Sequence, residues 1–229
     1  MPLIYPFGFL GQRGGSIQVN FRAWWVSITD TSSPVFSNIN IGDPAADRIV
    51  VAGWHLGQAW SNPCVMNVSG VGNITMQPAS PMDWTVSGAL ASLWWAHVPS
   101  GTTASFTAYS VSTSGSHALG VWVLRGASIA NPIFDLNFTE SPTANPSLSV
   151  NVARGGAVIG MARQVANQGS FTWSGLTENF DETWGTDNFR ASGASRMFQN
   201  AASNYNVAVT PQTAGTVCRL SIASFRPAP

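Results

Sequence analysis

The carboxylates near position 180 are the side chains of this chain with the clearest potential for chemistry. Four of its ten acidic residues lie close together in sequence, as Glu178, Asp181, Glu182 and Asp187. Two carboxylates at close range could hydrolyse a glycosidic bond, and their hard oxygens could instead bind calcium. They could also pair with Arg190 or Arg196, or simply lie in a solvated loop. A solvated loop is the favoured interpretation of these carboxylates. A single short helical turn over residues 179–187 is the structural alternative.

No other group of residues has the pattern of a catalytic or metal site. The histidines His55, His97 and His117 each lack a second ligand at zinc-binding spacing. The chain contains no nucleophile elbow, no phosphate-binding loop and no dinucleotide fingerprint. Cys64 and Cys218 both lie among apolar residues, which predicts two buried thiols rather than a disulfide. We therefore expect no enzyme activity and no cofactor.

Aromatic residues are the second group that could carry function. An exposed pair of indoles could stack on a sugar ring, although packing in a core or between subunits is the commoner use of tryptophan. The candidates for a glycan or interface contact are the two doublets, Trp24, Trp25, Trp94 and Trp95. Sequences around the two doublets differ, so they do not indicate a repeat. Near the N-terminus, Tyr5, Phe7 and Phe9 predict a docking arm, with a strap across the same domain as the alternative.

The charge composition points to an assembly or binding protein. The chain of 229 residues has three glutamates and no lysine, and all ten of its basic residues are arginine. Tryptophan and arginine are enriched where proteins meet, whereas lysine and glutamate are depleted there. With a net charge of zero and only 9% charged residues, the chain has no basic surface for nucleic acid. Its apolar runs are too short for a bilayer, so we expect no membrane insertion.

Short apolar or alternating segments predict the elements that must hold these residues. The segments recur between Gly, Pro and Ser/Asn breakers and give about twelve strands, typical of an all-β, antiparallel β-sandwich of the jelly-roll kind. Residues 1–16 form an extended arm in this prediction, and residues 17–229 form a single sandwich domain.

Several of these strands carry specific expectations. In the first one, Ile17, Val19, Phe21 and Ala23 should share one face. Residues 48–52 should form a fully buried central strand, and residues 216–225 the last strand. Residues 102–111 and 118–125 read as the clearest hairpin, joined by a turn at residues 113–116.

Six segments between about Asp47 and the C-terminus are informative when they are taken in order, and they are residues 47–53, 96–102, 118–122, 155–160, 171–178 and 220–227. As an ordered set, they resemble a family of virion proteins of tailed phages and prophages, chiefly of alphaproteobacteria. The resemblance implies a β-sandwich structural protein located in the virion, and it transfers no catalytic residue. The N-terminal part with Trp24 and Trp25 lies outside it.

Within that family, a tail-associated fibre or adhesin is favoured over a capsid decoration protein. The implied partners are other virion proteins, further copies of the chain, with a trimer favoured, and a host-surface polysaccharide. A free carbohydrate-binding module and a glycan-cleaving depolymerase are the alternatives outside a virion.

Overall fold

The computed structural model describes residues 15–27, 31–56, 65–79, 90–109, 117–141, 145–164, 169–184, 189–212 and 217–229. Within these ranges the backbone forms seventeen strands. No helix there is long and apolar enough to cross a bilayer. The first nine strands are β1 (Gln18–Ser27), β2 (Val35–Asn40), β3 (Ile49–Leu56), β4 (Val65–Ser69), β5 (Ile74–Thr75), β6 (Gln77–Pro78), β7 (Leu90–His97), β8 (Thr103–Tyr109) and β9 (His117–Arg125). The others are β10 (Ile133–Ser141), β11 (Ser147–Val152), β12 (Ala157–Gln164), β13 (Phe171–Ser174), β14 (Thr177–Trp184), β15 (Phe189–Met197), β16 (Ala202–Pro211) and β17 (Cys218–Phe225).

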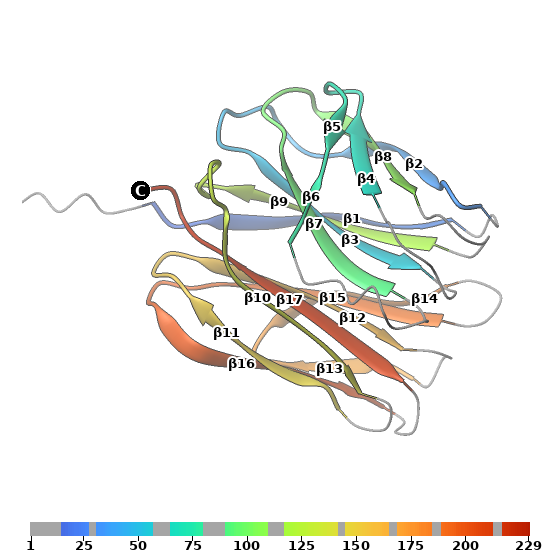
Figure 1. Cartoon of the computed structure of the whole chain (residues 1–229), viewed down its shortest axis with the longest axis vertical. Helices are drawn as coiled ribbons and strands as arrows, with labels where there is room; N and C mark the ends of the chain where they lie inside the picture. The colour runs from blue at the N-terminus through green and yellow to red at the C-terminus, as the bar shows by residue number, and fades with distance from the viewer. Residues whose placement is uncertain are drawn as a thin grey trace, which may run out of the picture.

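The strands form four sheets stacked as layers (Figure 1). The outer N sheet has the order β2-β8-β4-β5, and the inner N sheet has the order β1-β9-β3-β7-β6. The inner C sheet follows, with the order β10-β17-β12-β15-β14, and the outer C sheet has the order β11-β16-β13. Every pairing between these strands is antiparallel. The predicted all-β sandwich is therefore confirmed.

Three apolar cores fill the spaces between the four layers. Val50 and Ala52 of β3 face the first core, against the outer N sheet, while Ile49 and Val51 face the middle core between the two inner sheets. Strand β12 repeats this alternation, because Ile159 lies in the middle core and Val158 in the third core, against the outer C sheet. The central strands of both inner sheets are thus buried on both faces, which explains why they read as continuous apolar runs.

The two halves of the chain have the same topology. The order β1-β9-β3-β7 becomes β10-β17-β12-β15 when each strand is replaced by its counterpart, and β2-β8-β4 becomes β11-β16-β13. Each half is a jelly roll, and the pair share the middle core. The inner sheets match to their last strand, since β6 pairs with β7 as β14 pairs with β15, whereas β5 extends the outer N sheet beside β4 and has no counterpart among the described strands of the outer C sheet. The tryptophan doublets lie on β1 and β7, which are not counterparts, so they do not mark this duplication.

The strands run between two ends of the stack. We call the end where the described chain starts and the C-terminus lies the terminus end, and the other the opposite end. At the terminus end, the Ile17 amide donates to the Gly155 carbonyl (2.8 Å) and the Ala228 amide donates to the Gly126 carbonyl (2.8 Å). The start of β1, the connection between the halves, the β11–β12 turn and the C-terminus therefore meet there (Figure 1). Gly155 has a φ of +73°, a conformation that side chains with a Cβ rarely adopt.

Several sequence predictions can be compared with these strands. The fully buried central strand is confirmed, since β3 pairs on both sides with β7 and β9. The last strand is confirmed as β17. The hairpin prediction is wrong, because β8 and β9 lie in different sheets. The helical turn is also wrong where the structure describes it, because Asn179 lies in strand β14.

The predicted face of the first strand is wrong for one residue. The register of β1 on β9 shifts between Phe21 and Ala23, so Arg22 is the extra residue of a β-bulge. Val19, Phe21 and Trp24 consequently pack on the middle core, whereas Ala23 packs on the first core. Of the predicted arm, residues 1–14 lie outside the described residues, and so do Tyr5, Phe7 and Phe9.

Candidate functional site

Glu178, Asp181 and Glu182 lie in an edge strand, β14, rather than in a loop, and Asp187 lies outside the described residues. The Asp181 carboxylate accepts two hydrogen bonds from Arg190, from Nε to Oδ1 and from Nη2 to Oδ2, each of 2.7 Å. It also accepts one from the Phe171 amide at 2.9 Å. The side chains are 7% and 15% exposed, and hydrogen bonding to Asp181 raises the pKa of Arg190. Asp181 therefore links β14 to β13 and β15. Its partner Arg190 is one of the two arginines named in the sequence analysis.

The two glutamates of the same strand remain at the surface. Glu178 and Glu182 are both exposed. Partial burial, and then the charge of Asp181, raise the pKa of Glu178, while Arg190 lowers it. No group of three His, Cys, Asp or Glu side chains that could hold a metal occurs among the residues that the structure describes. With Asp181 bound to Arg190, the described part of this strand gives no support to the calcium interpretation.

The four candidate tryptophans do not form one surface. Trp94 is only 3% exposed and its Nε1 donates to Ser92 Oγ (2.9 Å), so it cannot present a face to a sugar. Trp24 stacks on Phe180 with ring centroids 4.4 Å apart, and Trp95 packs against the middle core. Trp25 is 42% exposed. Trp25 is therefore the member of the two doublets whose exposed ring is available to a glycan.

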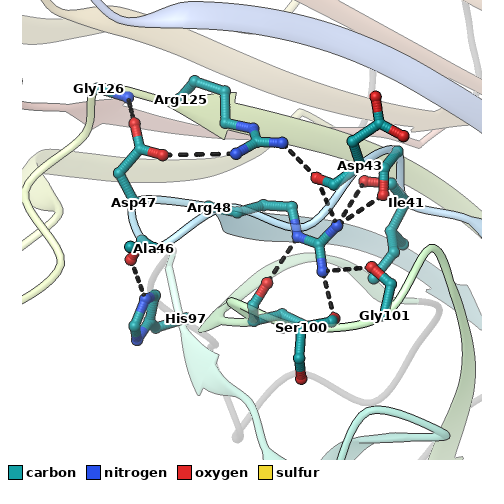
Figure 2. Close-up of polar contacts among 12 residues, drawn as sticks. Ile41, Asp43, Ala46, Asp47, Arg48, His97, Ser100, Gly101, Arg125 and Gly126 are labelled. Atoms are coloured by element: carbon teal, nitrogen blue, oxygen red, sulfur yellow. Dashed lines mark hydrogen bonds and ion pairs between the residues drawn. The ribbon is translucent and has the colours of Figure 1, made fainter.

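A buried arginine that the sequence analysis did not identify links two loops at the terminus end (Figure 2). Arg48 precedes β3, and its side chain is fully buried. Its Nε donates to the Val98 carbonyl (2.6 Å) and its Nη1 donates to the carbonyls of Gly42 (2.7 Å) and Asp43 (3.0 Å). Its Nη2 donates to the carbonyls of Ser100 and Gly101. Burial, followed by the charges of Arg125 and Arg22, lowers the pKa of Arg48.

The contacts around Arg48 join two of the segments that carry the family resemblance. Residues 47–53 supply the guanidinium, and residues 96–102 supply carbonyl acceptors. His97 Nε2 lies 2.7 Å from the Ala46 carbonyl, and Asp47 accepts a hydrogen bond from the Gly126 amide at 2.7 Å (Figure 2). These segments therefore hold the loops in place.

A second set of buried charges lies at the opposite end, between the inner sheets. Arg163 and Arg219 are direct partners on β12 and β17, and Arg219 Nε donates to Glu140 (2.6 Å). The Arg163 guanidinium lies over the Phe189 ring, 4.6 Å from its centre. Burial and the charge of Arg219 lower the pKa of Arg163 to about 9.

The three histidines do not converge on a metal site. His55 and His117 lie at the opposite end, where Leu56 pairs with His117, whereas His97 ends β7 at the terminus end. Burial, and then the charge of Arg163, lower the pKa of His55 well below its ordinary value. Cys218 is also buried, whereas Cys64 lies outside the described residues, so the predicted pair of buried thiols is confirmed for Cys218 alone.

An open groove at the terminus end is the strongest candidate for a binding site. It has a volume of about 570 Å³, a size common among ligand pockets. We call it the Phe134 groove. Its lining comes from the start of β10, the β11–β12 turn and the start of β16, and comprises Phe134, Asp135, Asn151, Val152, Ala153, Arg154, Ala201, Ala202 and Ser203. Sequence analysis could not identify it, because these residues are far apart in the chain and share no motif.

Comparisons with known proteins give little further information. No protein-family model matches the chain, and no curated protein is detectably similar to it. A structure of cucumber necrosis virus is similar at 12% identity with a TM-score of 0.27, covering 96% of each chain. A structure of Sulfolobus turreted icosahedral virus is 9% identical with a TM-score of 0.29, covering 94% of this chain and 60% of that one.

A conserved protein of unknown function from Pseudomonas aeruginosa is 10% identical with a TM-score of 0.30, covering 95% of this chain and 92% of that one. At TM-scores this low, the similarities support no inference about this chain. Its function has to be argued from its own residues.

Proposed function

We propose that this chain is a structural component of a tailed-phage virion, associated with the tail, where it contributes to assembly and to contact with the host surface. The ordered resemblance of its segments supports this role. Those segments supply parts of β3, β7, β9, β12, β14 and β17 in the inner sheets, all of β13 in the outer C sheet, and the turns beside them. A resemblance concentrated in the structural framework suits a particle protein whose family shares an architecture rather than a reaction.

The distribution of exposed apolar side chains is the observation that carries the proposal. Large exposed apolar residues occur in two groups at opposite ends of the stack. Those nearer the terminus end are Ile129, Phe134, Leu136 and Met197. Those nearer the opposite end are Trp25, Val26, Val35 and Tyr109. Exposed apolar groups commonly mark protein contacts, and two different groups suit a head-to-tail interface that closes into a ring such as a trimer.

The N-terminal segment is proposed as the docking element. The described chain starts at Gly15, and Ser16 passes beside Gly155 at the terminus end. Tyr5, Phe7 and Phe9 lie outside the described residues, and the described chain begins at the end of the stack that carries Ile129 and Met197. A neighbouring virion protein or a second copy of the chain is the proposed partner.

Two other functions have an observation in their favour. A capsid decoration protein would use the same exposed apolar groups to join capsomers. A free carbohydrate-binding module would use the Phe134 groove, and it would be a monomer.

Immunogold labelling of purified particles from the source, with antibody to this chain, tests the location. Label on the tail supports the proposal, and label over the head replaces it with the decoration role. Absence of label on particles that react with an antibody to a known coat protein would leave the free binding module.

Sedimentation velocity of the purified chain tests the assembly. We expect a trimer at micromolar concentration, weakened in the exposed-residue variants Trp25→Ser and Tyr109→Ser. A wild-type chain that remains a monomer at this concentration would contradict self-assembly.

A further inference from the structure

The Phe134 groove combines an exposed aromatic ring with a fixed polar wall. Phe134 is 42% exposed although it lies on a strand of the inner C sheet. The Arg226 guanidinium lies 5.1 Å from the centre of the Phe134 ring, and its Nη2 donates to the Ile133 carbonyl (2.8 Å). Arg226 is not part of the groove lining. It therefore supports the ring from outside the groove and leaves the lining side of the ring available.

The polar wall is held in place by hydrogen bonds within the fold. Asp135 Oδ2 accepts from the Asn151 amide (2.7 Å) and from Asn151 Nδ2 (3.0 Å), and its Oδ1 accepts from the Leu136 amide (2.8 Å). Asn151 Oδ1 accepts in turn from the Asn204 amide (3.1 Å), and Asn204 has a φ of 50°. Both side chains line the groove in fixed orientations while keeping spare donor and acceptor capacity.

The groove lining carries one carboxylate and one guanidinium, those of Asp135 and Arg154. The Asp135 carboxylate accepts from three N–H donors of the fold, which leaves Arg154 as the charged group with which an acidic ligand can pair. Arg154 is exposed on the β11–β12 turn, and within the part of the chain that the structure describes it has no hydrogen bond or ion pair. A guanidinium in this position can bind a carboxylate through two parallel hydrogen bonds.

We propose that the Phe134 groove binds an acidic oligosaccharide that contains uronic acid. The Phe134 ring packs on the apolar face of one sugar, while Asp135, Asn151 and Ser203 exchange hydrogen bonds with its hydroxyl groups. Arg154 pairs with the carboxylate of a uronate. The proposal deepens the proposed function by naming the class of host-surface polysaccharide, and in that respect it rests on it. The groove itself is a property of the isolated chain.

Isothermal titration calorimetry of the full chain with hexagalacturonate and with neutral maltohexaose tests the proposal. We expect hexagalacturonate to bind with a Kd on the order of 10⁻⁴ M and maltohexaose to bind at least about tenfold more weakly. Phe134→Ala should weaken hexagalacturonate binding about tenfold, the loss expected for one aromatic contact. Arg154→Gln should weaken it about as much and reduce its dependence on salt.

Leu136→Ala is the matched control, because Leu136 is exposed to a similar extent on the same strand but does not line the groove. This variant should bind like the wild type, and thermal unfolding should show that all three variants are folded. Absence of binding to hexagalacturonate, or equal losses in Phe134→Ala and Leu136→Ala, would overturn the proposal. The acidic specificity would be overturned if both oligosaccharides bound equally well and Arg154→Gln left this binding unchanged. These results are independent of where the antibody label falls, so failure here leaves the virion assignment intact.

Discussion

Arginine performs, in this lysine-free chain, a task that a lysine could not perform. Arg48 is buried among backbone carbonyls from two loops, and its planar guanidinium directs donors toward several of them at once. A lysine ammonium has three donors on a flexible stem and cannot reproduce this fork. Arg190 and Arg226 likewise bind several acceptors or an acceptor and a ring. Arginines of this kind are structural residues, although they are polar and rare.

Replacing Arg48 should destabilise the protein strongly. Arg48→Leu removes the donors of at least five carbonyl contacts in a buried site, and buried acceptors without partners are costly. We expect a loss of about 3–5 kcal/mol in the free energy of unfolding, measured by urea titration. Arg48→Lys should recover only part of this loss.

Arg154→Gln serves as the control for that series, because Arg154 is exposed. Its free energy of unfolding should stay within about 0.5 kcal/mol of the wild type. An Arg48→Leu protein with wild-type stability would mean that the two loops do not depend on the guanidinium.

The Cys218 thiol should be almost inert in the folded protein. Burial raises its pKa to about 12 from an ordinary value of 9.0, and the side chain is fully buried. The thiolate fraction at pH 8 therefore falls about a thousandfold, and the thiolate is the reactive form. In a Cys64→Ser background, a thiol reagent should label no cysteine in the folded chain and one in urea. Rapid labelling in the absence of urea would show that the third core opens readily.

At the scale of elements, the sequence predicted individual strands better than their partners. The apolar run of β3 identified a central strand because a strand buried on both faces needs apolar residues throughout. Alternation in β8 and in β9 predicted strands as well, but not their pairing. Alternation specifies which side chains face a core, and a turn can lead to the opposite sheet as easily as to the adjacent strand. The hairpin prediction was wrong because alternation carries no information about which strand is the hydrogen-bonded neighbour.

The candidate sites were predictable to different degrees for a similar reason. Asp181 and Arg190 are close in sequence, so their pairing was among the alternatives, and the structure places them on adjacent strands. Arg48 and the Phe134 groove depend on segments that only the tertiary fold brings together. The bulge at Arg22, which turns Ala23 away from the middle core, left no signal in the alternation either.

The close approach of the inner sheets makes a glycine in β15 irreplaceable. A Cβ at Gly193 would lie 2.7 Å from the Trp122 ring and would overlap the Phe180 ring. Both rings belong to the aromatic cluster of the middle core, with centroids 5.9 Å apart, so neither can move without disturbing the other. Gly193→Ala should lower the free energy of unfolding by about 1–3 kcal/mol or more.

Gly15→Ala provides the comparison, because a Cβ at Gly15 meets no atom within 4 Å. It should change stability by less than about 0.5 kcal/mol. A Gly193→Ala protein as stable as Gly15→Ala would indicate that the inner sheets have room to separate.

At the scale of the whole molecule, we expect the shared middle core to make the two jelly rolls one folding unit. Each inner sheet covers the other, so neither half can be exposed to water without uncovering apolar residues such as Val51, Trp122, Ile159 and Phe225. The Ser221 hydroxyl crosses this interface to donate to the Ala91 carbonyl (2.6 Å). Two units that only touched at their surfaces would unfold separately, whereas units that share a core should unfold together.

Two probes placed in different halves test this coupling in a Cys64→Ser background. Eight of the ten tryptophans precede residue 126, so tryptophan fluorescence reports mainly the N-terminal half, while thiol labelling of Cys218 reports the C-terminal half. We expect both probes to give the same urea midpoint. Met161→Ala, which removes a buried side chain that packs against Gly53 across the middle core, should lower both midpoints equally and cost about 2–5 kcal/mol. If the midpoints separate, or if Met161→Ala shifts only the thiol probe, the middle core is a contact between independent domains and the two jelly rolls fold separately.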